Sequence, residues 1–135
     1  MEMRLTGLLP EVLVVDHPEV DAQHEQIFIR VEVLKNACCA ANYPGIEDFD
    51  DLLGFVAHHF ATEERIAEQA GLEFSEHAKK HRDSLCLLGK ALDRVRDDHG
   101  NVFDFLRYAE YWFERHILEE DKSFGALIKT SSGLR

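Results

Sequence analysis

Apolar residues recur at steps of three and four through four successive segments of the chain, which is the period of an α-helix. The segments cover roughly residues 19–39, 47–70, 75–97 and 101–129. They are similar in length, and the connections between them are short. This pattern predicts an all-α fold, an up-down-up-down antiparallel four-helix bundle.

Residues outside the helical pattern set the expected boundaries. Residues 1–17 read as an extended N-terminal arm, residues 18–130 as the bundle and residues 131–135 as a C-terminal tail. Pro18 suits the first turn of a helix, because the N–H that it lacks has no intrahelical partner there. Gly71 is a plausible C-terminal cap, and Ser75 is a good N-cap for the third helix.

Composition narrows the classes of protein. The chain has 135 residues, of which 45% are hydrophobic, so one domain with a sizeable core is expected. The net charge of −11 repels phosphate groups, which argues against nucleic acid and anionic membranes as partners. The apolar stretch over residues 8–15 is too short and interrupted for a signal peptide or membrane span. We expect a soluble, cytoplasmic protein, a monomer or weak oligomer, with no protein partner indicated.

Three cysteines, Cys38, Cys39 and Cys86, are present. An odd count without CxxC spacing argues against a disulfide framework and against a thiolate zinc site. Reduced thiols are therefore expected.

Polar residues interrupt every one of the four apolar stripes near the middle of the helix. A buried imidazole or carboxylate without a partner costs several kcal/mol. A single such histidine is more often a hydrogen-bonded core residue than a ligand, but a set on all four stripes favours a shared metal site. Imidazole with carboxylate suits first-row transition metals such as iron. The candidate ligands are His24, His59, Glu63, His77, His81, His116 and Asp121.

The spacing of the candidate ligands supports convergence. His59 and Glu63 are four residues apart, as are His77 and His81, so each pair lies on one helix face. His116 and Asp121 are five apart, about 140° around an ideal α-helix. Either the helix is widened there, as at π-bulges, or Asp121 reaches in from the flank; we predict a widened turn. The remaining histidines, His17, His58 and His99, are interpreted as surface residues.

Over about residues 16–129 these residues resemble the hemerythrin family, and specifically its single-domain bacteriohemerythrins. All seven ligand positions of the family's pattern are filled in the same order. The matching blocks are Asp21-Ala22-Gln23-His24, His59-Phe60-Ala61-Thr62-Glu63-Glu64, His77-Ala78-Lys79-Lys80-His81 and His116-Ile117-Leu118-Glu119-Glu120-Asp121.

The resemblance implies two non-haem iron ions joined by an oxo or hydroxo bridge. By resemblance, one iron is bound by His77, His81 and His116 and is coordinatively full. His24 and His59 would bind the other iron and leave it an open position for dioxygen. Glu63 and Asp121 would bridge both irons. The resemblance also places five residues around a dry dioxygen pocket: Ile27, Phe60, Trp112, Phe113 and Ile117.

The chain departs from the family pattern in three places. The N-terminal arm lacks the tryptophan that is common there, and Leu72-Glu73-Phe74 replaces the usual Tyr-Pro before His77. Phe113 stands where leucine is more frequent. The first two differences should affect loop packing, whereas the phenyl ring could narrow the oxygen path.

Reversible dioxygen binding without enzymatic activity is the function that the resemblance implies. One alternative is an oxygen or redox sensor that acts through a partner protein, although sensors are usually fused to signalling domains and 135 residues leave no room for one. Another is a di-iron oxidase or peroxidase. Ferritin-like oxidases use Glu-x-x-His on two helices, and no glutamate of this chain has a histidine three residues later.

Overall fold

The computed structural model describes residues 9–39, 46–96 and 102–133, and almost all of them are helical. The short connections at 40–45 and 97–101 and the chain ends lie outside the described residues. The elements, in chain order, are a 3₁₀-helix η1 (Glu11–Leu13), α1 (Pro18–Cys39), α2 (Ile46–Ala70), α3 (Ser75–Arg96), α4 (Val102–His116), a π-helix η2 (Ile117–Asp121) and α5 (Lys122–Gly133).

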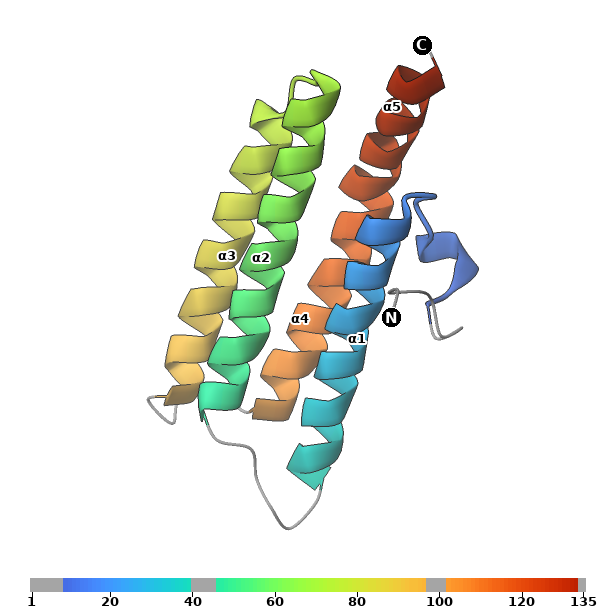
Figure 1. Ribbon diagram of the computed structural model, residues 1–135. Helices are drawn as coiled ribbons and strands as arrows, with labels where there is room; N and C mark the ends of the chain where they lie inside the picture. The colour runs from blue at the N-terminus through green and yellow to red at the C-terminus, as the bar shows by residue number, and fades with distance from the viewer. Residues whose placement is uncertain (1–8, 40–45, 97–101, 134–135) are drawn as a thin grey trace.

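The long helices form a bundle in which chain neighbours lie side by side (Figure 1). α1 contacts α2, α2 contacts α3, and α3 contacts α4. Contacts between α1 and α4 close the ring. α4, η2 and α5 follow one another without a break, so they act as one long helix (Figure 1). The expected all-α bundle is thus confirmed.

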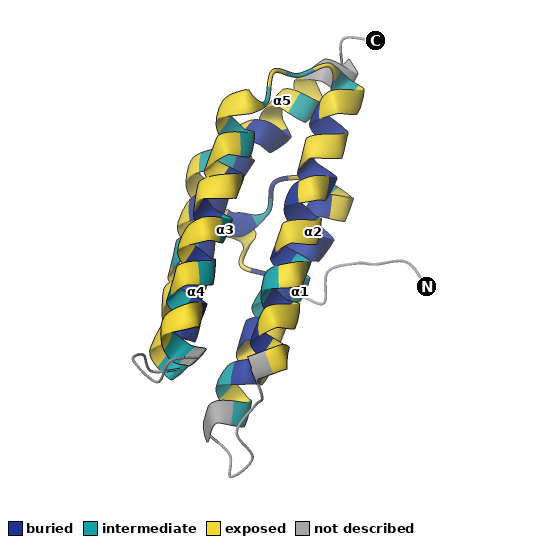
Figure 2. Cartoon of the chain, turned by 90° about the vertical axis from the view of Figure 1, so that its left-hand side faces the viewer, coloured by how far each residue is buried: buried dark blue, intermediate teal, exposed yellow. Residues whose placement is uncertain are grey.

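Each helix turns its apolar stripe toward the bundle axis, and Figure 2 shows the exposed residues on the outside. At one end an apolar layer fills the interior with side chains that are nearly inaccessible to solvent. The rings of Phe49 and Phe105 lie 6.1 Å apart there and show that the first turns of α2 and α4 meet. The layer also contains Leu34, Leu52, Leu92 and Leu106.

The predicted helix ends are partly right. α1 begins at Pro18, as expected. Gly71 has a φ of 69°, and the N–H of Leu72 donates to the carbonyl of Ala67 at 3.0 Å, which is a Schellman cap. The third helix begins at Ser75, as predicted, but Ser75 is its first helical residue and not its N-cap. The N–H of Ser75 donates to the Glu73 side chain at 2.8 Å. The N–H of Ala78 is instead accepted by the backbone carbonyl of Phe74.

Residues 9–17 are not extended throughout, because η1 interrupts them with a short helical turn. Asp21 in the first turn of α1 anchors this segment, since its carboxylate accepts the N–H groups of Val15 at 2.8 Å and His17 at 3.2 Å. Gly125 of α5 lies so close to Val15 that an added Cβ would overlap with its carbonyl oxygen. Because Gly125 has no side chain, the backbone at Val15 can approach α5 closely.

The predicted widening after His116 is confirmed, because Ile117–Asp121 form a π-helix. Helix continues past the expected end near Lys129 as far as Gly133. In the part of the chain that the structure describes, no helix combines the length and apolar character needed to cross a bilayer.

Candidate metal centre

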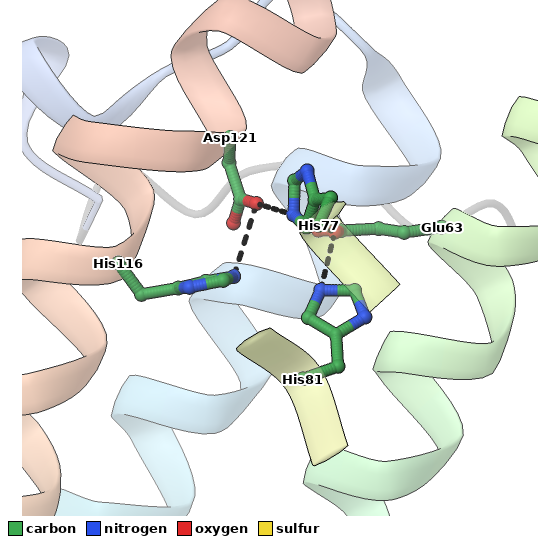
Figure 3. Close-up of side chains that lie close together, drawn as sticks. All are labelled: Glu63, His77, His81, His116 and Asp121. Carbon is green, nitrogen blue, oxygen red and sulfur yellow. Dashed lines mark hydrogen bonds and ion pairs between the residues drawn. The ribbon is translucent and has the colours of Figure 1, made fainter. Parts of the chain in front are cut away.

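All seven candidate ligands converge in the middle of the bundle. Six of them are nearly inaccessible to solvent, and His77 is 11% exposed. α1 contributes His24, α2 contributes His59 and Glu63, and α3 contributes His77 and His81. His116 is the last residue of α4, and Asp121 is the last residue of η2. Figure 3 shows five of these side chains pointing toward one another, Glu63 from α2, His77 and His81 from α3, and His116 and Asp121 from α4 and η2.

The ligand atoms fall into two groups that share both carboxylates. One group consists of Glu63, His77, His81, His116 and Asp121, and the other of His24, His59, Glu63 and Asp121. Within each group the ligand atoms lie within 4.8 Å of one another. Each group could hold a metal ion.

The two oxygens of Glu63 face different groups. Oε1 lies 3.3 Å from Nε2 of His77 and 3.2 Å from Nε2 of His81. Oε2 lies 2.8 Å from Nε2 of His59 and 3.5 Å from Nε2 of His24. A carboxylate with one oxygen toward each group is placed to bridge two cations.

Asp121 is divided in the same way. Its Oδ1 lies 3.1 Å from Nε2 of His77 and 3.2 Å from Nε2 of His116, whereas its Oδ2 lies 3.0 Å from Nε2 of His24. The π-helix makes this possible, because an ordinary α-helical turn would leave Asp121 about 140° from His116.

Most of these polar atoms lack hydrogen bonds. Among the described residues, eight buried side-chain nitrogen and oxygen atoms have no hydrogen-bond partner, and all eight belong to the candidate ligands. Buried polar atoms are almost always hydrogen-bonded, so such a concentration needs a further group to satisfy them. Imidazole nitrogens and carboxylate oxygens that converge within each group are the ligand types that first-row metal ions prefer.

The two carboxylates remain ionised despite their burial. Burial would raise the pKa of Glu63, but the imidazoles of four surrounding histidines, 2.8–3.5 Å from its oxygens, hold it well below its ordinary value. Burial and the charge of Glu63 would raise the pKa of Asp121, but the imidazoles of His116, His24 and His77, 3.0–3.2 Å from its oxygens, lower it instead. The centre of the bundle therefore carries fixed negative charge that attracts cations.

The histidines respond unequally to that negative charge. Burial alone would lower the pKa of His24 and of His77, but the carboxylates of Asp121 and Glu63 raise both pKa values to about 9. Burial dominates at His59 and lowers its pKa. Without a metal, protons on His24 and His77 take the place of cations.

Aromatic rings enclose the ligands. Phe60 stacks on His81 with ring centroids 3.9 Å apart, and Phe74 stacks on His77 at 4.3 Å. Trp112 stacks on His116 at 5.1 Å with an angle of 17° between the rings. These contacts restrict the orientation of three imidazoles.

Of the five residues predicted to line a dioxygen pocket, Phe60, Trp112 and Phe113 have ring contacts with candidate ligands. Ile27, Phe60, Phe113 and Ile117 are buried, and Trp112 is partly exposed. The Phe113 ring centroid lies 5.3 Å from that of His24 and 6.0 Å from that of His59. A cavity of about 10 Å³ is lined in part by Ile27, Trp112 and Phe113. Phe60, Ile117 and the seven candidate ligands are not in its wall.

The other histidines and the cysteines lie away from the site or outside the described residues. His58 is exposed, as expected. His17 is half-buried, and its Nδ1 accepts the N–H of Val20 at the start of α1. Cys86 is a free, exposed thiol. His99 and the side chains of Cys38 and Cys39 are not among the parts described.

Two further residues, Gln23 and Glu64, had no role predicted from the sequence. Their side-chain oxygens lie within hydrogen-bond distance of Nδ1 of His59 and Nδ1 of His81. Gln23 offered a weak signal in the sequence, since it belongs to the matching block that ends at His24. Glu64 offered little, because an exposed glutamate on a helix is ordinary.

The chain is similar to characterised proteins over most of its length. The family described as "Hemerythrin HHE cation binding domain" matches residues 16–128. A bacteriohemerythrin of Methylococcus capsulatus is 29% identical over 114 residues, which cover 80% of this chain and 85% of the relative. Bacteriohemerythrins of Pseudomonas paraeruginosa and Pseudomonas aeruginosa are each 30% identical over 115 residues, which cover 83% of this chain and 74% of the relatives.

Proposed function

Because this chain belongs to the hemerythrin family, we propose that it binds dioxygen reversibly at a pair of non-haem iron ions. Storage, delivery or scavenging of oxygen would follow from such binding, without enzymatic turnover. The observation that carries the proposal is the arrangement of two ligand groups that share Glu63 and Asp121 but contain different numbers of histidines.

The ligand roles follow from this arrangement. His77, His81 and His116 would hold one iron, and His24 and His59 would hold the other. Glu63 and Asp121 would bridge the pair, which the division of their oxygens between the two groups supports. The iron pair, when bound, supplies the electrons that make dioxygen binding possible.

The unequal histidine count determines where dioxygen would enter. The group with two histidines has one protein ligand fewer, and Phe113 lies against both of those imidazoles. His24 and His59 are themselves inaccessible to solvent, so this group would be kept dry. A dry pocket suits reversible binding, because water and protons would otherwise promote irreversible oxidation.

A visible spectrum of the reduced, iron-loaded protein tests the proposal. We expect a band that appears on exposure to air and disappears under vacuum, together with two iron ions per chain by metal analysis. Irreversible oxidation in air would contradict oxygen carriage and favour a sensor or an oxidase. A preparation that binds a single zinc ion and no iron would overturn the di-iron assignment itself.

A further inference from the structure

The two ligand groups differ in the hydrogen-bond acceptors at the Nδ1 atoms of their histidines, which face away from the site. In the three-histidine group, Nδ1 of His81 lies 3.2 Å from Oε2 of Glu64. In the two-histidine group, Nδ1 of His59 lies 2.7 Å from Oε1 of Gln23. One acceptor is an anion and the other is a neutral amide.

The orientation of the Gln23 amide follows from its hydrogen bonds. The hydroxyl of Thr62 donates to the carbonyl of His58 at 3.2 Å, so its oxygen is free to accept. Nε2 of Gln23 donates to that oxygen at 3.1 Å, which turns Oε1 toward His59. An amide oxygen can only accept, so Nδ1 of His59 carries the proton and Nε2 presents a lone pair to the site.

Glu64 imposes the same tautomer on His81 by a different route. It follows the bridging Glu63 directly in α2 and reaches across to α3, with 46% of its side chain exposed. A carboxylate can only accept, so Nδ1 of His81 is the donor and Nε2 faces the site. Carboxylate acceptors behind a metal-bound histidine raise its basicity, and they do so more than neutral acceptors.

The second histidine of the smaller group has no such support. Nδ1 of His24 is buried and has no hydrogen-bond partner in the parts of the chain that the structure describes. The two-histidine group therefore has one neutral acceptor behind its imidazoles, and the three-histidine group has an anionic one. The two groups thus differ both in the charge of this acceptor and in their number of histidines.

We propose that Glu64 and Gln23 are positioning residues that make the two metal positions electronically unequal, with the anionic acceptor behind His81 and the neutral acceptor behind His59. This inference rests on the di-metal arrangement of the proposed function. The position that His81 serves binds its metal more tightly and favours the higher oxidation state. The metal position that His59 would ligate has weaker electron donors, and it is the position with one protein ligand fewer.

The test compares Glu64→Gln with Glu68→Gln. Glu68 is an exposed glutamate one turn further along α2, so both variants lose one negative charge from the same helix. Titration of the metal-free proteins with Co²⁺ against a competing chelator measures both dissociation constants. We expect about tenfold weaker binding at the tighter of the two positions, which His81 serves, in Glu64→Gln. This is the lower end of the range for lost outer partners, because Glu64 is partly exposed. Glu68→Gln should match the unmodified protein at both positions.

A proton NMR spectrum of the Zn²⁺-loaded protein provides a second measurement that needs no oxygen chemistry. We expect the Nδ1–H signal of His81 to move upfield in Glu64→Gln, because an amide is a weaker acceptor than a carboxylate. Glu64→Asp should restore part of the shift, since the anion remains. The signal of His59 should stay in place in both variants and move only when Gln23 is changed.

The outcomes separate this inference from the proposed function. Equal dissociation constants for Glu64→Gln and Glu68→Gln, or an unmoved His81 signal, would overturn the inference even if oxygen binds reversibly. Equal weakening at both positions would also overturn it, because a general loss of charge would then suffice. If the expected shifts are found but air oxidises the iron protein irreversibly, the inference stands and oxygen carriage fails.

Discussion

The apolar layer at one end of the bundle and the ligand layer in its middle are equally buried, but they are stabilised differently. Phe49, Leu52 and Phe105 fill the first with side chains that gain free energy simply by leaving water. In the second, Glu63 and Asp121 are ionised and completely buried. Such groups are tolerated only with cations beside them. The comparison teaches that one layer is complete as folded, whereas the other requires metal ions or protons.

Removal of a bridging carboxylate should have the largest effect. Glu63→Ala deletes a ligand of both groups, so we expect loss of both metal ions rather than of one. Metal content after gel filtration at neutral pH measures this. Retention of one ion at full occupancy would show that Glu63 serves only one position.

The matched change in the apolar layer should lower the stability of the fold and leave metal binding unchanged. Leu52→Ala leaves a cavity between α2 and its neighbours, and we expect a loss of about 2–5 kcal/mol in the free energy of unfolding. Metal content should stay unchanged, because Leu52 is not among the candidate ligands. Denaturant unfolding of metal-free protein measures the loss, and reduced metal content in a folded variant would break the distinction between the layers.

The ligand layer alone should respond to pH near neutrality. In metal-free protein His24 and His77 have pKa values of about 9, so both carry protons that metal ions must displace. We expect affinity to rise with pH up to about 9, by up to about tenfold per pH unit for each proton displaced. Isothermal titration in buffers of different ionisation enthalpy counts the protons released. A flat profile between pH 7 and 9 would contradict the raised pKa values.

The same pKa values give the metal-free fold its own pH dependence. The stabilisation from protonated His24 and His77 is complete below their unfolded pKa of about 6.5 and is lost as pH rises through about 9. The stabilisation from ionised Glu63 and Asp121 is present above their ordinary pKa values and is lost as pH falls. Metal-free protein should therefore lose stability in both directions, and thermal unfolding across pH measures it.

The smallest expected effect concerns the boundary between the two layers. Phe113→Leu removes part of the ring that lies against His24 and His59, so we expect several-fold faster oxygen dissociation or autoxidation. Phe105→Leu, in the apolar layer, is the matched control and should leave both rates unchanged. Stopped-flow measurements decide between them, and equal rates in all three proteins would show that the Phe113 ring does not control access.

Helical periodicity was enough to predict the bundle, because apolar stripes at steps of three and four have few other solutions. Periodicity predicted the ends of the helices less accurately. Ser75 has the residue type of an N-cap, but α3 already includes it, and the carbonyl of Phe74 accepts the N–H of Ala78. Helix beyond Lys129 was missed because its residues are mainly small and polar, although Thr130 donates to the carbonyl of Ala126 there.

The candidate site could be anticipated because polar residues on apolar faces stand out against the pattern. The five-residue step from His116 to Asp121 even predicted a π-helical turn, since an α-helix cannot bring both inward. The partners of the outer ring nitrogens could not be found in this way. The contact between Glu64 and His81 depends on how α2 and α3 pack, and an exposed glutamate leaves no trace in the hydrophobic pattern.

The stacked ring beside His116 has a practical consequence. Trp112 is the sole tryptophan of the chain, and its indole lies face to face with an imidazole that belongs to the candidate centre. Tryptophan emission from this protein therefore originates within one aromatic contact of a candidate ligand. The fluorescence of Trp112 can therefore report, without an added label, the binding and removal of metal at the ligand group that contains His116.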